Sequence, residues 1–262
     1  MTATVLLTFD FDADSPWLQP GVADAAYDLT QRSWGAYGAR RGIHRILAML
    51  AELELQATFF LPGWTCDAYP DRVKEIHAAG HEVGHHGYHH VPPVTLSASA
   101  QREDLLRGVE AIERCTGERP LGYRSPSWQL TPTTLALLVE NGFAYDSSCM
   151  GDDRPYVERH GELEILELPV HWTLDDFPHL GWTSSHGGPL RDAAEMIVTW
   201  RREVDAAIVE QRPLVLTCHP EMTGRAGPLA AFADFVRDLC DDGRVRFARC
   251  IDVARSLAGP AG

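Results

Sequence analysis

The sequence is poor in the features that mark membrane proteins and nucleic-acid-binding proteins. No uninterrupted apolar run approaches the roughly 18 residues that a membrane-spanning helix needs. Basic residues are scarce, with 23 lysines and arginines against 37 acidic residues, and the formal net charge of −14 repels phosphate backbones. We therefore expect neither a membrane nor a nucleic acid among the partners of this 262-residue chain.

Signals of several other protein classes are also missing. No GxGxxG motif follows the expected first strand, and the chain contains no Walker A motif. The N-terminus runs directly into an apolar segment, with neither the basic region nor the cleavage site of a signal peptide, so we expect a cytoplasmic protein. The six cysteines form no CxxC pair, and their wide spacing favours reduced thiols, mostly small core residues.

What the sequence has in excess is histidine within one short segment. Five of the twelve histidines fall in residues 80–90. Neutral imidazole is the commonest metal ligand near neutral pH, so the segment predicts a metal site. A solvated histidine-rich loop or a purification tag is the alternative, but a tag would lie at a terminus. Cys218, next to a histidine, is an alternative nucleophile, although a metal site accounts for more residues.

Strand-like and helix-like patterns alternate along the chain. The expected strands are 4–11, 57–61, 81–84, 121–124, 143–146, 165–169, 213–218 and 245–248. Helical spacing of apolar residues, such as Ile43, Ile46 and Leu50, fills most of the intervals, and segments 13–34 and 170–190 are expected loops. We expect residues 1–262 to form one domain, a distorted (β/α) barrel with seven or eight parallel strands. An open, doubly wound sheet is the alternative.

Reactive side chains lie at or just beyond the expected C-terminal ends of these strands. They are Asp10, Asp12, His86, His90, Arg124, Asp146 and His219. In a barrel these strand ends meet at one mouth, where the catalytic groups of this fold lie. Each residue alone could be a turn or surface residue. Together they predict a three-ligand metal site with acid and base groups around it.

Five motifs in the right order resemble those of the polysaccharide deacetylase family, also known as carbohydrate esterase family 4. They are TFDFD at 8–12, GHEVGHHGYHH at 80–90, YRSPSW at 123–128, DSS at 146–148 and LTCHP at 216–220. The resemblance covers nearly the whole chain. It implies a distorted barrel, a divalent metal, commonly zinc, and hydrolysis of N-acetyl groups. The subgroup it points to includes intracellular peptidoglycan deacetylases and allantoinase-like enzymes.

The resemblance also implies roles for individual residues. The metal ligands would be Asp12, His86 and His90; the catalytic residues would be Asp10 as base, Arg124 orienting it, and His219 as acid. Tyr88, Trp128 and Asp146 are the expected substrate contacts, with core packing the alternative for tryptophan. One carboxylate and two imidazoles leave zinc an open position for water, whose pKa falls from 15.7 toward about 7.

Some assignments stay open at this point. His85 and His89 have the same spacing as His86 and His90, which one helical turn after the strand would place on one face. Phe11 separates two aspartates that are adjacent in most of the family, so Asp12 as base with Asp14 as ligand is an alternative.

The substrate is the least determined feature. Gly87 replaces the family's usual Ser or Thr, and Cys149-Met150 stand where an aromatic residue is usual. We expect an acetylated amino sugar or polysaccharide as substrate, with a small cyclic amide as the alternative. The loop at 170–190 would decide this if it caps the mouth, although a contact in a homo-oligomer is an alternative use. A metal-free binding module would not bring Asp10, Asp12 and His219 together.

Overall fold

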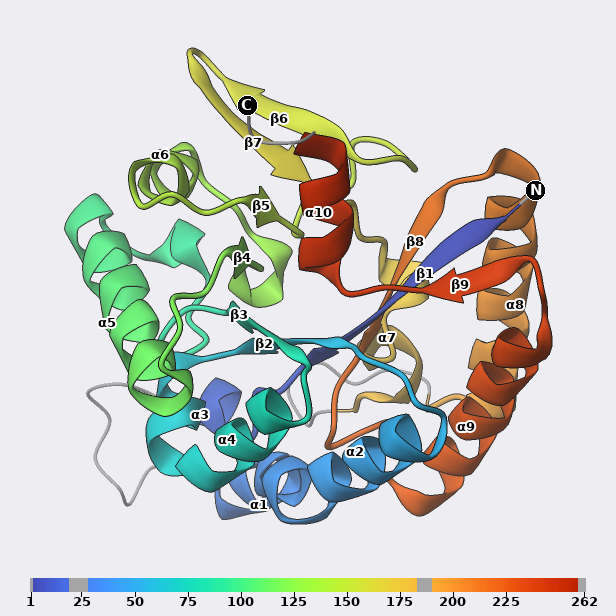
Figure 1. The fold of residues 1–262 in the computed structure, drawn as a ribbon. Helices are drawn as coiled ribbons and strands as arrows, with labels where there is room; N and C mark the ends of the chain where they lie inside the picture. Colours follow the sequence, from blue (N-terminus) through green and yellow to red (C-terminus); the bar gives the residue numbers. More distant parts are fainter. Residues whose placement is uncertain (1, 19–27, 183–189, 259–262) are drawn as a thin grey trace.

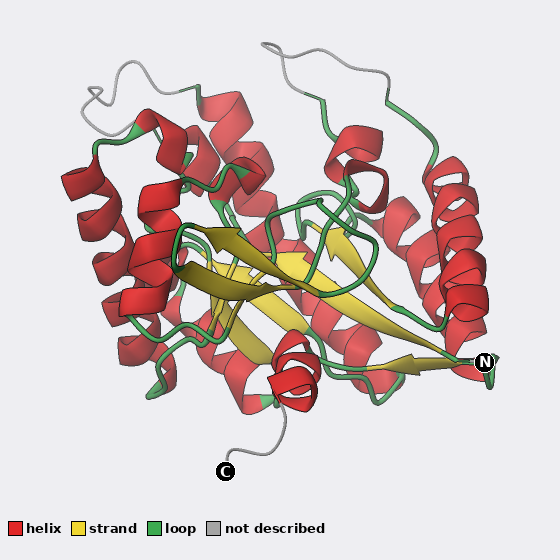
Figure 2. Cartoon of the chain, turned by 90° about the horizontal axis from the view of Figure 1, so that it is seen from above, coloured by secondary structure: helices red, strands yellow, loops and turns green. Residues whose placement is uncertain are grey.

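The computed structural model describes residues 2–18, 28–182 and 190–258, and within them the strands form one curled sheet (Figures 1 and 2). The strands are β1 (Ala3–Asp10), β2 (Thr58–Leu61), β3 (Glu82–His85), β4 (Gly122–Tyr123), β5 (Tyr145–Asp146), β6 (Tyr156–His160), β7 (Leu163–Glu167), β8 (Pro213–Cys218) and β9 (Val245–Phe247). Their order is β6-β7-β5-β4-β3-β2-β1-β8, and β9 pairs with β1. All of these pairs are parallel except β6 with β7, so the expected α/β class is confirmed.

Helices cover the outer face of this sheet and connect successive strands (Figure 1). The described helices are α1 (Leu29–Tyr37), α2 (Ile43–Glu52), α3 (Gly63–Ala68), α4 (Pro70–Ala78), α5 (Ala98–Thr116), α6 (Pro132–Glu140), α7 (Phe177–Leu180), α8 (Ala193–Glu210), α9 (Ala226–Asp241) and α10 (Cys250–Ala258), of which α10 does not lie on the outer face. None of the described helices is both long enough and apolar enough to cross a membrane.

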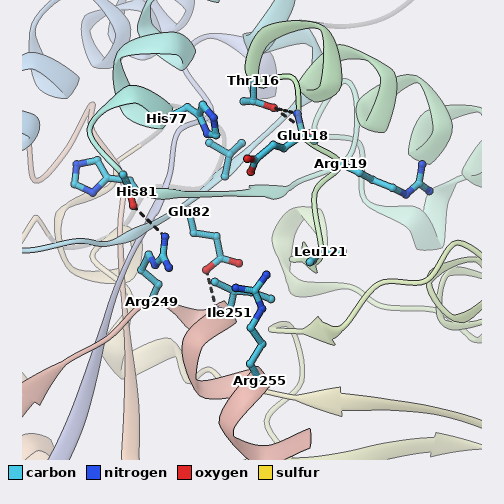
Figure 3. Close-up of a pocket in the computed structure, with 12 residues that line it drawn as sticks. His77, His81, Glu82, Thr116, Glu118, Arg119, Leu121, Arg249, Ile251 and Arg255 are labelled. Carbon is cyan, nitrogen blue, oxygen red and sulfur yellow. Dashed lines mark hydrogen bonds between the residues drawn. The ribbon is translucent and has the colours of Figure 1, made fainter. Parts of the chain in front are cut away.

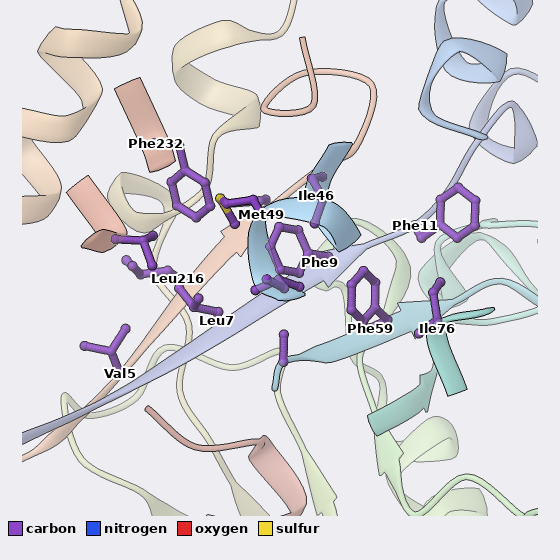
Figure 4. Close-up of a cluster of buried hydrophobic side chains, with 14 of the residues drawn as sticks. Val5, Leu7, Phe9, Phe11, Ile46, Met49, Phe59, Ile76, Leu216 and Phe232 are labelled. Carbon is purple, nitrogen blue, oxygen red and sulfur yellow. The ribbon is translucent and has the colours of Figure 1, made fainter. Parts of the chain in front are cut away.

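Strand β1 is buried along its whole length because both of its faces are covered. Its odd-numbered residues, such as Leu7 and Phe9, face the outer helices. On this face Phe9 also stacks on Phe59 of β2, with 4.9 Å between ring centroids (Figure 4). Leu6, of the other parity, packs inside the curled sheet with Phe60. Successive strand residues face opposite sides, so Asp10 belongs to the interior face where the strand ends.

Helix α10 lies inside the curve of the sheet (Figure 1). Its first amide groups are bound by strand side chains: Cys250 N donates to Thr58 Oγ1 at 2.9 Å, and Ile251 N donates to Glu82 Oε2 at 2.9 Å. These bonds satisfy amides that have no partner within the helix. The helix therefore packs against the N-terminal half of the sheet interior and leaves the C-terminal strand ends to the candidate site.

The sheet closes only in part. Between β7 and β8, the described backbone makes a single bridge, Asp175 with Thr217, together with a hydrogen bond from Asp176 N to Thr217 O of 3.0 Å. The molecule is thus a curled half-barrel, a distorted form of the expected barrel, and the segment after β7 completes its wall at the C-terminal mouth.

Several elements differ from the sequence-based expectations; one of them is α7, which lies inside the segment 170–190 that was expected to be a loop. Helix α1 begins inside the segment 13–34, which was expected to be a loop, with Asp28 accepting from Thr30 N and Gln31 N at its start. Strand β6 was not expected and forms a hairpin with β7 through a two-residue turn that begins at Gly161, at φ +61°. Parts of both expected loops, residues 19–27 and 183–189, lie outside the described residues.

Candidate active site

The C-terminal ends of β1 and β3 bring one carboxylate and two imidazoles together. Asp12 follows β1, and His86 follows β3. The His86 Nε2 atom lies 3.6 Å from Asp12 Oδ1, and the His90 Nε2 atom lies 3.3 Å from Asp12 Oδ2. One ligand atom from each of the three residues lies within 4.8 Å of the others. These distances leave room for one cation among the three side chains.

The tautomer of His86 follows from its hydrogen bond. Its Nδ1 atom lies 2.7 Å from the carbonyl oxygen of Arg124, and because a carbonyl only accepts, Nδ1 must carry the proton. Burial lowers the pKa of His86 and so favours the neutral ring. The Nε2 lone pair therefore faces Asp12, as a metal ligand's would.

The carboxylate of Asp12 also has an atom that is free to bind a metal. Its Oδ1 atom is buried and has no hydrogen-bond partner, since the facing His86 nitrogen has no proton to donate. Burial raises the pKa of Asp12 to about 6, although His86 and His219 oppose the shift. A buried, unpaired carboxylate oxygen is costly. The residues present therefore fit a divalent cation that would satisfy Asp12 and both imidazoles.

The histidine loop reaches this position without helical structure, so the expected helical turn between His86 and His90 is wrong. Gly87 at φ +72° and His90 at φ +57° turn the chain instead. Asp104 of α5 fixes the loop by accepting from Tyr88 N at 2.8 Å and from His89 N at 3.3 Å.

The alternative ligands point elsewhere. His85 is buried and uses both ring nitrogens on backbone, with Nε2 3.0 Å from Leu105 O and Nδ1 accepting from Gly87 N. His89 packs edge-on against Tyr88. Asp14 accepts from Tyr69 at 2.8 Å and pairs with Arg32 at 3.1 Å, outside the group formed by Asp12 and the two histidines.

Asp10 lies beside this group and is paired with the buried Arg124. The guanidinium donates from Nη1 to Asp10 Oδ1 at 2.7 Å and to Thr8 Oγ1 at 2.8 Å. Two further donations, to the carbonyl and hydroxyl oxygens of Ser147 at 3.0 Å each, fix its plane. Burial alone would raise the pKa of Asp10, but Arg124, together with His86 and His219, outweighs burial and the pKa is lowered. Asp10 is therefore an ionised carboxylate, 3.8 Å from His86 Nε2.

His219, just after β8, lies near the other oxygen of Asp12, the one that does not face His86. Its Nε2 atom lies 3.9 Å from Asp12 Oδ2, while Nδ1 lies 2.7 Å from Asp176 Oδ1. Asp176 Oδ2 also accepts from the backbone N of His219 and from Thr223 Oγ1. Burial alone would lower the pKa of His219, but the charge and hydrogen bond of Asp176, together with the charges of Asp175 and Asp10, outweigh burial and raise the pKa well above its usual value. His219 is therefore held protonated.

Asp176 is the functional residue that the sequence reading left without a role. Asp175 and Asp176 lie in the segment 170–190, which was expected to be a loop, and Asp176 is 43 residues from His219 in sequence. The signal that would have found Asp176 is the pair of acidic residues in the segment that precedes β8, because a histidine at a strand end needs a carboxylate to orient it.

The expected substrate contacts have different surroundings. Trp128 is stacked on the half-exposed Trp172, with ring centroids 4.3 Å apart, and so forms an aromatic surface. Tyr88 donates its hydroxyl to Asp67 at 2.9 Å and packs under Arg107, between α3 and α5. Asp146 is fully buried and faces Ser148 and Glu167. Substrate contact by Tyr88 and Asp146 stays a prediction that these surroundings do not support.

A separate cavity of about 250 Å³ lies near the N-terminal end of β3, away from the strand ends that carry the candidate site (Figure 3). His77, Glu82 and Arg249 are among its lining residues, and none of the lining residues belongs to the candidate active site. Glu82 is already bound by Tyr145, Thr58 and Ile251 N.

Comparisons with known proteins agree with this geometry. A family model described as polysaccharide deacetylase matches residues 2–145. A peptidoglycan deacetylase of Helicobacter pylori is 30% identical over 295 aligned residues, which cover 97% of this chain and 96% of that protein. A Mycobacterium smegmatis structure described as a polysaccharide deacetylase is 37% identical, with a TM-score of 0.92, and covers 98% of this chain and 90% of that one. The Puue allantoinase structure, at 23% identity, reaches a TM-score of 0.84 over 99% of this chain and 92% of that one, which shows the same fold.

A curled parallel sheet with carboxylates and imidazoles at its C-terminal mouth defines a hydrolase of the (β/α)-barrel class. The match to the family model over more than half of the chain, and the Helicobacter relative over nearly all of it, show that this chain belongs to the polysaccharide deacetylase family. The deacetylases of this family are hydrolases of amide carbon–nitrogen bonds.

Proposed function

We propose that this chain is a zinc-dependent deacetylase that removes acetyl groups from an amino sugar in an oligosaccharide or polysaccharide. The observation that carries the proposal is the convergence of Asp12, His86 and His90 between an ionised carboxylate, Asp10, and a protonated imidazole, His219. The relatives named as peptidoglycan deacetylases support the substrate class. The oxygen and nitrogen donor set favours zinc among divalent ions.

The ligands we propose are Asp12 Oδ, His86 Nε2 and His90 Nε2. A bound zinc ion supplies Lewis acidity, which polarises the amide carbonyl and lowers the pKa of water. Hydrolysis then needs one group that accepts a proton from the attacking water and one that donates a proton to the departing nitrogen.

Asp10 is the proposed base. Its carboxylate is kept ionised by Arg124 and lies on the same interior face of β1 as Asp12, so it is near any water held by the ligand group. Because Arg124 is itself fixed by Ser147, the carboxylate oxygen that it does not bind has one defined direction. That oxygen, Oδ2, lies 3.8 Å from His86 Nε2 and therefore faces the ligand group.

His219 is the proposed acid. Asp176 accepts from its Nδ1 and leaves the Nε2–H directed toward Asp12 Oδ2, on the side of the ligand group where an amine would depart. The charge of Asp176 keeps the ring protonated at neutral pH, so the proton is present when the carbon–nitrogen bond breaks.

Hydrolysis of a small cyclic amide is a second candidate, favoured by the burial of the site. Asp10, Asp12, His86 and His219 are all at most 8% exposed, and Phe177 packs edge-on against His219. A site this enclosed suits a chain end or a small ring better than the middle of a polymer. Assays of acetylated chitooligosaccharides and of hydantoin and imide rings with one preparation will separate the two candidates.

The metal site is tested by His86→Ala with His89→Ala as the matched control. Elemental analysis of the purified protein is expected to find one equivalent of metal in the parent and in His89→Ala, because His89 lies outside the ligand group. His86→Ala is expected to lose most of that metal and the activity with it. Stoichiometric metal in a folded His86→Ala variant would remove the ligand assignment.

A further inference from the structure

Two cysteines from different helices lie in contact on the outer layer of the fold, where α3 packs against α5 (Figure 1). Cys66 is buried in α3, and Cys115 is partly exposed near the end of α5. The Cys115 thiol donates to the carbonyl oxygen of Cys66 at 3.4 Å, across 49 positions of sequence, and Cys66 is the neighbour that lowers the pKa of Cys115 most. The two side chains therefore face each other.

The environment of Cys115 makes it the reactive member of the pair. The neighbouring Cys66 side chain lowers the pKa of Cys115 to about 7; burial and Asp67 oppose this shift, whereas the positive charges of Lys74 and Arg114 favour it. All six cysteines lie in the described part of the chain, and the pKa of each of the other five is raised. Thiolate character together with access to solvent is what makes a cysteine reactive toward disulfides.

We propose that Cys115 and Cys66 form a modification site that reacts with low-molecular-weight disulfides and ends as a bond between α3 and α5. The Cys115 thiolate attacks one sulfur of the disulfide RSSR and displaces one thiolate, which gives a mixed disulfide. Cys66 then loses its proton and attacks the Cys115 sulfur, which displaces the second thiolate. Two cysteine thiols give up two electrons and two protons, and RSSR is reduced to two RSH.

Helix α3 connects this site to the candidate metal centre. Thr65, next to Cys66, donates its hydroxyl to the carbonyl oxygen of Asp12 at 2.8 Å. Gly63 N and Trp64 N donate to the carbonyl oxygens of Gly87 and Tyr88, both at 2.9 Å. The same short helix thus supports Asp12 and the histidine loop.

Helix α5 supports the loop from its other side. Asp104 accepts from the backbone of Tyr88 and His89. A bond between α3 and α5 would join these two supports and restrict their separation. We therefore expect the oxidised protein to unfold at a higher temperature and to release its metal to a chelator more slowly.

The test treats the metal-loaded protein with oxidised glutathione and then alkylates the remaining thiols. Intact mass is expected to show loss of two alkylation sites and of two hydrogens, without bound glutathione, and peptide mapping is expected to join Cys66 to Cys115. Cys66→Ser is expected to stop at a mixed disulfide on Cys115, because the second thiol is absent. Cys240→Ser, which removes an exposed cysteine on α9, is the control and is expected to react like the parent.

A stable glutathione adduct on Cys115 of the parent, or faster modification of Cys240, would overturn the proposal. So would an intramolecular bond that survives in Cys115→Ser. Mass and mapping do not use catalytic activity, so this test can fail while the proposed function stands, and the reverse also holds.

Discussion

His219 shows how one neighbour sets the chemistry of a residue. Burial alone would lower the pKa of His219, but Asp176, Asp175 and Asp10 together raise it well above the usual value, and Asp176 contributes most among them. An acid catalyst must be protonated, so activity is expected to persist to alkaline pH and fall above the raised pKa of His219. Asp176→Asn removes the charge and keeps a side chain of similar shape. In a pH profile of kcat/KM, the activity of Asp176→Asn is expected to fall at a lower alkaline pH than that of the parent. Its turnover at the optimum pH is also expected to be lower.

A structural role for Asp176 would give a different result. Thr223→Val removes another hydrogen bond to the same carboxylate without changing its charge, so it is the control and is expected to leave the alkaline limit in place. An unchanged limit in folded, metal-loaded Asp176→Asn would show that Asp176 does not set the protonation of His219.

The acid itself is tested by His219→Ala. Removing a positioned general acid reduces turnover by about 10²- to 10⁴-fold. The variant is expected to keep its metal, because the proposed ligands are Asp12, His86 and His90. Full turnover in this variant, measured as acetate release beside elemental analysis, would contradict the role of His219.

Local sequence patterns predict part of this site and miss the rest for a physical reason. Asp10, Asp12 and His86 follow apolar strands, and a parallel sheet brings such ends to one edge, so their meeting was predictable. The partner of His219 comes from a loop whose path no periodicity describes. Tyr88 looks the same in sequence whether it lines a groove or packs beneath Arg107, and the structure shows packing.

At the scale of elements, β5 and β7 place two carboxylates side by side. Asp146 and Glu167 are register partners on these parallel strands, and both are fully buried. Glu167 Oε1 accepts from Ser148 N and Cys149 N, and burial together with the Asp146 charge raises the pKa of Glu167 well above 4.5. The raised pKa favours a protonated Glu167 beside Asp146, which avoids the repulsion between two like charges.

The pH dependence of stability follows from that proton. Unfolded Glu167 titrates near 4.5, whereas the folded form keeps its proton to higher pH, so folding loses stability as pH rises between the two values. Glu167→Gln keeps a donor toward Asp146 and removes the titration. Its Tm relative to the parent is expected to rise from pH 5 to pH 8. Glu162→Gln, at the exposed hairpin turn, is expected to show no such trend, and a constant difference for Glu167→Gln would contradict the raised pKa of Glu167.

The elements that sequence patterns missed are those without a strong period. Strand β6 is mostly exposed and polar, so only its turn glycine marks it, whereas β1 and β8 are long apolar runs. Helix α1 begins with a capping aspartate but has only two buried residues, Gly35 and Ala36, which gives no apolar stripe to detect.

The sequence also did not predict which segments of backbone pack directly against each other. The π-helical turn Gly38–Gly42 joins α1 to α2, and a Cβ on Gly42 would lie 1.9 Å from the carbonyl oxygen of Pro220. The loop that carries His219 therefore packs directly on this turn. Glycine is required there because the backbones touch, and a single sequence does not reveal which glycine serves that purpose.

For the whole molecule, the class of fold was predictable and its closure was not. Alternating strands and helices imply a parallel sheet with helices outside, which the structure has. Whether the last strands pair depends on curvature and on the segment after β7, whose described residues make a single bridge to β8, Asp175 with Thr217. We propose that residues 1–262 form a single domain, because one sheet runs through the described residues from β1 to β9.

Metal binding is expected to stabilise this whole fold, because the proposed ligands come from opposite ends of the first third of the chain and are buried together. A ligand that binds only the folded state at 100 times its Kd adds about 2.7 kcal/mol to the free energy of unfolding. For a domain of this size that corresponds to a change in Tm of roughly 5–10 °C. Removing metal with a chelator should lower Tm by that amount in the parent and in His89→Ala, and zinc should restore it. The Tm of His86→Ala should respond to neither treatment; an equal response in all three proteins would mean that the stabilising ion binds elsewhere.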